Sequence, residues 1–117
     1  MSGPARPWPT EIRVRRAAKR MAVSFDTGES FDFPADFLRV MTPSAADRGH
    51  EGMVKLEPLA IDKTGVGIRD VTLIGRYAAR IAFDDGHETG LYTWDLLHKL
   101  GREQASLAAR HKALLQK

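Results

Sequence analysis

The chain has 117 residues, which is long enough for one compact domain and too short for two ordinary ones. Hydrophobic residues make up 43% and charged residues 28%, a composition that excludes an intrinsically disordered chain. The absence of cysteine excludes disulfides and thiolate-rich zinc or iron–sulfur sites, so a bound metal would need His, Asp, Glu or backbone oxygen ligands. The net charge of +3 is a mild excess of basic residues.

Neither a membrane span nor a signal peptide is predicted. A span needs an apolar run of roughly 18 residues or more, and the first ten residues, "MSGPARPWPT", lack the apolar core of a signal peptide. We therefore expect a cytoplasmic protein without a membrane partner.

The N-terminal third predicts an extended lead-in followed by a meander of antiparallel strands. Three prolines within residues 1–10 block regular structure, so a flexible lead-in is expected there. The alternating apolar residues of "EIRVRR" indicate a first strand that begins at Glu11, "MAVSF" indicates a second and "SFDF" a third. The predicted domain spans residues 11–103.

A short helix and a long connection should follow the third strand. Pro34 is suited to the first turn of a helix, and Phe37, Leu38 and Met41 fall at near-helical spacing. From Thr42 to about Thr64 the apolar pattern weakens, which favours a loop. Loops of that length in small domains are often functional.

The second half predicts two further strands and then helices. Val71 and Leu73 indicate one strand, Gly75 a turn, and the inner face of the next strand should carry Tyr77, Ala79, Ile81 and Phe83. Helix signals then follow, namely Thr93 as an N-cap, Gly101 as a residue just past the helix end, and a helical tail over residues 104–117. The expected fold class is α+β, with a small antiparallel sheet, a short helix after the third strand and one or two C-terminal helices.

Two hairpin registers are open for "FDDGHETG". A two-residue turn at Asp85-Gly86 would pair Asp84 with His87. A three-residue loop with Gly86 left-handed would pair Phe83 with His87 and place Ile81, Ala79, Thr89 and Leu91 on one face. The second register is preferred because it keeps the apolar residues together.

The histidines offer the main chemical candidates, although no catalytic motif is present. A second histidine after His50 or His87 that would complete an HExxH zinc motif is missing, and nucleophile elbows and phosphate loops are absent. We therefore expect no enzyme activity. His50 and His87 both follow a glycine in predicted loops, where binding residues are common.

These residues carry a resemblance to a known family. "FPADFLRVMTPSAADRGHEG", followed further along the chain by "VGIRDVTLIGRYAARIAFDDGHETGLYTWDLLHKLG", resembles the gamma-butyrobetaine hydroxylase-like N-terminal domain family. Members occur as small stand-alone bacterial proteins, as N-terminal domains of 2-oxoglutarate-dependent hydroxylases, and fused to Mrp-type iron–sulfur carrier ATPases. The resemblance covers about residues 11–103.

The resemblance also implies a metal position that this chain has only in part. The hydroxylase relatives hold a structural zinc through three cysteines and the histidine of a later turn. That histidine matches His87, whereas the cysteine positions fall on about Thr42, Ser44 and Asp47, which carry no thiolate. The cysteine zinc site is therefore expected to be lost. The catalytic domain of the hydroxylases is absent from this sequence.

We expect a small non-catalytic binding or accessory domain with an unidentified protein partner. The proteins to which related domains are fused suggest a link to iron–sulfur or metalloenzyme assembly or to a partner oxidoreductase. Its expected contact residues are Thr42, Ser44, Asp47, Tyr92 and Trp94. The alternative is a divalent-metal protein that holds Zn or Fe through His87, His50 and Asp85.

A weaker alternative is nucleic-acid binding through the basic stretch "RVRRAAKR". Its cations are Arg13, Arg15, Arg16, Lys19 and Arg20. The apolar residues that alternate with them favour a strand with one solvated face, and no aromatic residue lies among them to stack on bases. A nucleic-acid partner is therefore not expected.

Overall fold

The computed structural model describes residues 7–42, 58–88 and 90–116. This part of the chain folds into two three-stranded antiparallel sheets and three helices, which confirms the predicted α+β class. In chain order the elements are β1 (Pro9–Arg15), β2 (Arg20–Phe25), β3 (Ser30–Pro34), α1 (Ala35–Val40), β4 (Ile68–Ile74), β5 (Ala78–Phe83), β6 (Leu91–Thr93), α2 (Trp94–Arg102) and α3 (Gln104–Leu115). None of these helices is long and apolar enough to cross a membrane.

The first sheet is the predicted meander, with strand order β1-β2-β3. Because side chains alternate between the two faces of a strand, Met21, Val23 and Phe25 of β2 all point into the core and are at most 3% exposed. Val14 pairs with Met21 and Ile12 with Val23, so the apolar residues of β1 share this inner face. Its basic residues lie on the outer face, as the alternation predicts.

The second sheet has the order β4-β5-β6 and supplies the other half of the core. Val71 of β4 pairs with Ile81 of β5, and Leu73 pairs with Ala79. Tyr77 was expected on the inner face of β5, but β5 begins one residue later, and Tyr77 lies in the preceding turn, where it is 55% exposed. Gly75 accounts for this turn, because it adopts a φ of +56°.

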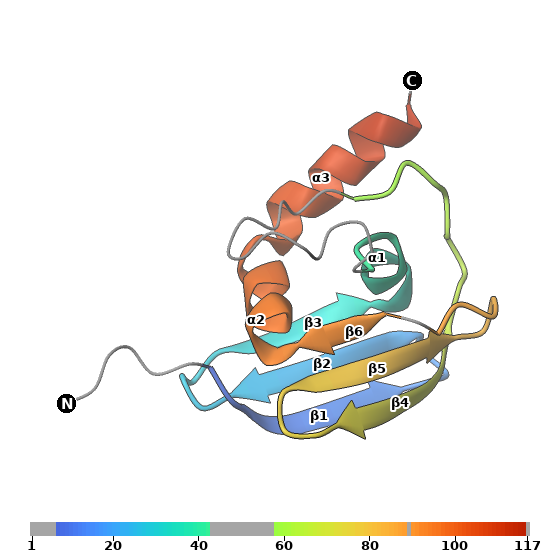
Figure 1. Ribbon diagram of the computed structural model, residues 1–117. Coiled ribbons are helices and arrows are strands. Elements are labelled where there is room, and N and C mark those ends of the chain that lie inside the picture. The colour runs from blue at the N-terminus through green and yellow to red at the C-terminus, as the bar shows by residue number, and fades with distance from the viewer. Residues whose placement is uncertain (1–6, 43–57, 89, 117) are drawn as a thin grey trace.

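Figure 1 shows the two sheets face to face, with β4 next to β1, β5 next to β2 and β6 next to β3. Helices α1 and α2 lie on the side of β3 and β6, and α3 projects beyond them. On the opposite side, where β1 and β4 lie, none of the described helices is found. Helices therefore close one side of the two-layer core, and in the described part of the chain the other side is left open.

The helix signals of the sequence are confirmed except at one end. The Thr93 side chain accepts a hydrogen bond from the backbone N–H of Leu96 at 3.1 Å, as expected of an N-cap. Gly101, expected just past the helix end, is instead inside α2, which continues to Arg102. A Cβ atom at Gly101 would overlap the ring of Phe31, so this glycine allows close packing of α2 against β3.

Candidate functional site

The β5–β6 turn adopts the preferred three-residue loop. The backbone N–H of Phe83 donates to the carbonyl of His87 at 2.8 Å, and the N–H of Gly86 donates to the carbonyl of Phe83 at 3.1 Å. Gly86 has a φ of +96°, the left-handed conformation that glycine adopts without strain. The turn therefore positions Asp85 and His87 as predicted.

Beyond the turn, the pairing of β6 differs from the predicted register. Tyr92 pairs with Ala79 and Leu91 with Arg80, so Leu91 does not share a face with Ala79 and Ile81 as expected. A one-residue shift between His87 and Leu91 turns Tyr92 inward instead. Its hydroxyl donates to the carbonyl of Leu38 at 2.6 Å. Burial raises the pKa of Tyr92, which keeps the phenol neutral.

Asp85 is the centre of a polar group that we call the Asp85 cluster, made up of Arg39, Lys63, Asp85, His87 and Thr42. Its carboxylate accepts from Lys63 Nζ at 2.8 Å, from Arg39 Nε at 3.0 Å and from the backbone N–H of His87 at 3.1 Å. Burial by itself would raise the pKa of Asp85, but these hydrogen bonds outweigh it and hold the pKa well below its usual range. The carboxylate therefore joins α1, the segment around Lys63 and the β5–β6 turn.

His87 lies beside this carboxylate. Its Nε2 atom is 3.0 Å from Thr42 Oγ1, and its ring lies 6.2 Å from that of Phe83 at the margin of the core. Burial lowers the pKa of His87, and the positive charge of Arg39 lowers it further. The imidazole is thus favoured in its neutral form, in a group whose other charges are two cations and one carboxylate.

The metal-binding alternative finds few ligands in the part of the chain that the structure describes. No group of three or more His, Cys, Asp or Glu side chains able to hold a metal is present there. Asp85 already bridges Arg39 and Lys63, and a divalent cation would have to displace them. His50 lies outside the described residues, so metal binding by His87, His50 and Asp85 stays a prediction.

The expected contact residues fall into two groups. Ser44 and Asp47 lie outside the described residues, and Thr42 is half-buried against His87. Tyr92 is fully buried and Trp94 is 7% exposed, with its Nε1 donating to the carbonyl of Arg76 at 2.8 Å. Both aromatic side chains are therefore largely buried rather than exposed, because the shifted β6 register and the start of α2 turn them inward.

The basic stretch is largely engaged within the molecule. Arg13 pairs with Glu11 at 2.7 Å and Arg20 with Asp32 at 2.8 Å. Arg16 and Lys19 bind the second sheet and the segment before it: Arg16 Nε donates to the carbonyl of Arg69 at 3.1 Å and Lys19 Nζ to that of Gly65 at 2.9 Å. Arg15 has no ion-pair partner among the described residues. The other four cations each have a partner within the molecule, so most of this charge is already engaged.

The sequence did not predict a groove at the open side of the two sheets, which we call the open-edge groove. It has a volume of about 570 Å³ and runs between β1 and β4. Its apolar lining comes from Trp8, Ile12, Val14, Val71, Leu73 and Trp94. The groove arises because β1 and β4 are each the outer strand of their sheet, with no strand or helix of the described chain across the gap.

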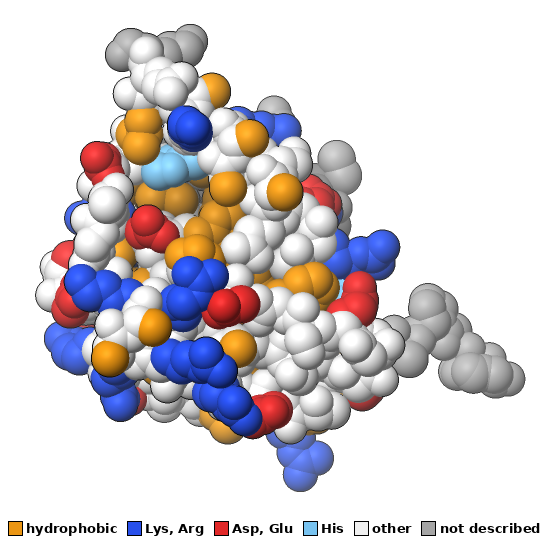
Figure 2. All heavy atoms as spheres, turned by 180° about the vertical axis from the view of Figure 1, so that it is seen from behind, with side chains coloured by type: hydrophobic (Ala, Val, Ile, Leu, Met, Phe, Trp, Pro, Cys, Tyr) orange, Lys and Arg blue, Asp and Glu red, His pale blue; other side chains and the backbone are white. Residues whose placement is uncertain are grey.

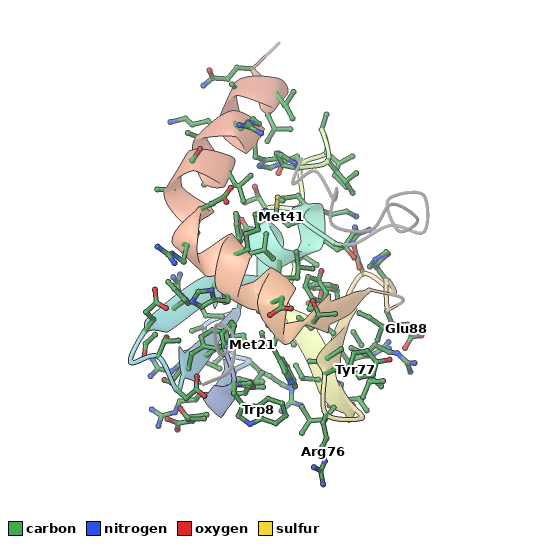
Figure 3. The ribbon with its side chains drawn as sticks, turned by 60° about the vertical axis from the view of Figure 1, so that its left-hand side comes forward. Trp8, Met21, Met41, Arg76, Tyr77 and Glu88 are labelled. Atoms are coloured by element: carbon green, nitrogen blue, oxygen red, sulfur yellow. The ribbon has the colours of Figure 1, made fainter. Side chains whose placement is uncertain are left out.

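Trp8 forms one end of this groove. Its backbone N–H donates to Asp26 Oδ1 at 3.1 Å, and its carbonyl accepts from the Asp26 N–H at 2.8 Å, which fixes it as an extension of β1. The indole meets the Trp94 ring edge-on at 6.4 Å and is 47% exposed. Figure 3 shows Trp8 near Arg76 at the lower end of the sheets. A tryptophan directly before an alternating strand was the one sequence signal for this feature.

A small α+β domain with a histidine in its β5–β6 turn is the class of protein that these elements define. The family model for the gamma-butyrobetaine hydroxylase-like N-terminal domain matches residues 12–98. The chain belongs to this family, which confirms the resemblance seen in the sequence.

Solved structures agree with this assignment, whereas no curated protein matches the sequence. A protein whose structure was determined by NMR is 34% identical, with 99% of this chain and 85% of that chain covered and a TM-score of 0.79. A protein of unknown function from the DUF971 family of Acidithiobacillus ferrooxidans is 31% identical, with 80% and 91% covered and a TM-score of 0.63. These likenesses establish the family and the fold.

Proposed function

We propose that this protein is a non-catalytic accessory domain that binds a partner protein through the open-edge groove. The observation that supports the proposal is the apolar groove between two outer strands, with exposed Trp8 and Leu73 at its margins. Leu73 is 63% exposed, although Ala79, its partner on β5, is fully buried. Contiguous apolar surface of this kind marks interaction sites in soluble proteins.

The polar residues of the described chain support binding more than catalysis. The Asp85 cluster holds its carboxylate in three hydrogen bonds, which leaves it poorly suited to accept a proton from a substrate. Tyr92 is buried and its hydroxyl is bound to a backbone carbonyl. These groups stabilise the fold, whereas the groove offers surface to another molecule.

The partner that we propose is a metalloenzyme, an iron–sulfur assembly factor or an oxidoreductase. This part of the proposal rests on the domain company of the family, in which related domains are joined to 2-oxoglutarate-dependent hydroxylases and to iron–sulfur carrier ATPases. The apolar groove supports the binding of a partner protein, and the fusions found in the family suggest the class of protein to which that partner belongs.

The proposal is tested by comparing the proteins that bind to two variants. Both variants carry the same Leu→Gln substitution, at two different places on the surface. Leu73→Gln removes exposed apolar surface in the groove, and Leu115→Gln removes it from the end of α3, where Leu115 is 39% exposed. Tagged proteins are cross-linked in cells of the source organism and the captured proteins are quantified by mass spectrometry. We expect Leu73→Gln to lose specific partners that the wild type and Leu115→Gln retain. Identical capture by all three folded proteins would contradict the proposal.

A further inference from the structure

The open edge of β4 is partly engaged by side chains at Arg69 and Val71. Successive residues of an outer strand alternately face the neighbouring strand and the open side with their backbone groups. The carbonyl of Arg69 accepts from Arg16 Nε at 3.1 Å, and the N–H of Val71 donates to Asp70 Oδ1 at 2.9 Å, so these two positions face the open side. The same alternation makes Leu73 the next such position.

The outward backbone groups of Leu73 have no corresponding partner in the described part of the chain. The carbonyl of Arg69 and the N–H of Val71 each bind a side chain, whereas Leu73 lies beside the groove and is 63% exposed. A strand that paired here would extend the second sheet beyond β4. Its inward side chains would then face Trp8, Ile12 and Val14, which line the groove from β1.

The charges near the groove favour an acidic occupant. Two charged residues line it, and one of them, Glu11, is held by Arg13 at 2.7 Å. The other, Arg76, has no ion-pair partner among the described residues, and Figure 3 shows it pointing away from the body of the molecule near Trp8. Seen from behind in Figure 2, Lys and Arg side chains also predominate on the lower part of the surface. A second copy of this chain would bring like charges together, whereas an acidic segment would neutralise them.

We infer that the open-edge groove binds an extended segment of a partner protein, in which apolar residues alternate with Asp or Glu, by pairing of its backbone with β4 at Leu73. This inference rests on the proposed binding function and adds the chemistry of the partner. Backbone pairing supplies the attachment, and alternate side chains supply the specificity. The inward apolar residues fill the groove, and an acidic residue reaches Arg76.

The experiment uses the full chain labelled with ¹⁵N and the peptide acetyl-EVEVEVEV-amide as the probe. Three comparisons isolate the features of the inference: acetyl-KVKVKVKV-amide changes the charge, an EVEVEVEV peptide N-methylated at alternate residues removes backbone donors, and Arg76→Glu reverses the charge of the protein. We expect the EVEVEVEV peptide to shift the amide signals of β4 around Leu73 and the indole signal of Trp8. The KVKVKVKV and N-methylated peptides should bind about tenfold more weakly, and Arg76→Glu should reverse the charge preference.

Other outcomes would overturn the inference. Shifts confined to other surfaces, equal binding of the N-methylated peptide, or no binding at millimolar peptide would exclude strand pairing at β4. Concentration-dependent broadening of the β4 signals without peptide would show that a second copy occupies the groove. If peptides fail while Leu73→Gln still loses its cellular partners, the partner docks as a folded surface, and the proposed function stands without this inference. If both experiments fail, both proposals are wrong.

Discussion

Asp85 joins three parts of the chain that are far apart in sequence, because Arg39, Lys63 and the backbone of His87 all donate to its carboxylate. The Arg39 side chain is 12% exposed and that of Asp85 is 21% exposed, so both charges have lost much of their hydration. Such an ion pair changes the net stability of the fold little while both partners are present. Removing one partner is strongly destabilising, because it leaves the other charge buried and unpaired. The cluster is therefore a structural anchor beside the expected metal position.

Asp85→Asn should lower the free energy of unfolding by about 2 kcal/mol near neutral pH, because it leaves two cations around a neutral amide. The pKa of Asp85 is lowered in the folded state, so its contribution is complete above the pKa of an unfolded aspartate, about 4, and is lost as the pH falls further. The difference between wild type and variant should thus be constant above about pH 5 and shrink as the pH falls from about 5 to about 3. Urea unfolding at several pH values measures it.

Glu88→Gln provides the control for that measurement. Glu88 pairs with Arg69 at 2.9 Å, but both side chains are more than half exposed. An exposed pair contributes little, so Glu88→Gln should change stability by less than about 0.5 kcal/mol. Equal effects of the two substitutions would contradict the role assigned to Asp85.

The metal-binding alternative makes a separate prediction at His87. If His87 and His50 hold a divalent ion, micromolar Zn²⁺ or Fe²⁺ should shift the ring NMR signals of both histidines together, and His87→Ala should abolish the response of His50. The low pKa of His87 favours the neutral ring that a metal requires, whereas the nearby cations of Arg39 and Lys63 oppose binding. Unchanged ring signals would exclude this alternative.

Helix α2 packs on β3 in a way that helix propensity alone does not predict. Gly101 lies inside the helix, and a methyl group there would overlap the ring of Phe31 on β3. In an exposed helix, Gly→Ala stabilises by about 1 kcal/mol. Here we expect Gly101→Ala to destabilise by about 2 kcal/mol, because the core would have to shift.

Chemical denaturation gives the sign of the Gly101→Ala effect directly. Combining it with Phe31→Leu should recover part of the loss, since the smaller side chain leaves room for the methyl group. A double-mutant cycle measures this coupling. A stabilised Gly101→Ala protein would show that α2 does not pack on Phe31 as described.

Elements with local signals were predictable from the sequence, whereas their mutual placement was not. The Gly86 loop and the Thr93 cap are set by residues within a few positions of one another, and both were predicted correctly. The β6 register was not, because a one-residue shift after His87 is decided by which side chain fits the core, and Tyr92 fits it better than Leu91. Gly101 was placed at a helix end for the same reason: its contact is with Phe31, far away in sequence.

The arrangement of the two sheets creates the open-edge groove, which was not predicted from the sequence. The alternation in β1 and in β4 predicted two half-buried strands but not that both would be outer strands on the same side of the molecule. That placement depends on the helices, which close the side of β3 and β6. The sequence therefore predicted site residues at the β5–β6 turn. It did not predict the open-edge groove, which depends on how the two sheets are placed in space.

The same arrangement determines what the basic stretch can do. Four of its five cations are engaged within the molecule, two with carboxylates of the first sheet and two with the second sheet or the segment before it. Release of counterions from a nucleic acid needs cations that are free to contact phosphates. The net charge of +3 alone supports only weak, sequence-independent attraction.

We therefore expect RNA and DNA oligonucleotides to bind no more tightly than about micromolar at physiological salt, the range of non-specific attraction. Fluorescence anisotropy over a range of salt concentrations measures this, with the Arg13→Gln, Arg15→Gln and Arg16→Gln triple variant for comparison. Because the ion pairs of Arg13 and Arg16 are more than half exposed and contribute little stability, the triple variant should remain folded, and its oligonucleotide affinity should fall only slightly. Tight binding whose salt dependence disappears in a folded triple variant would instead establish the nucleic-acid alternative, and with it a role for the outer face of β1 that the groove does not explain.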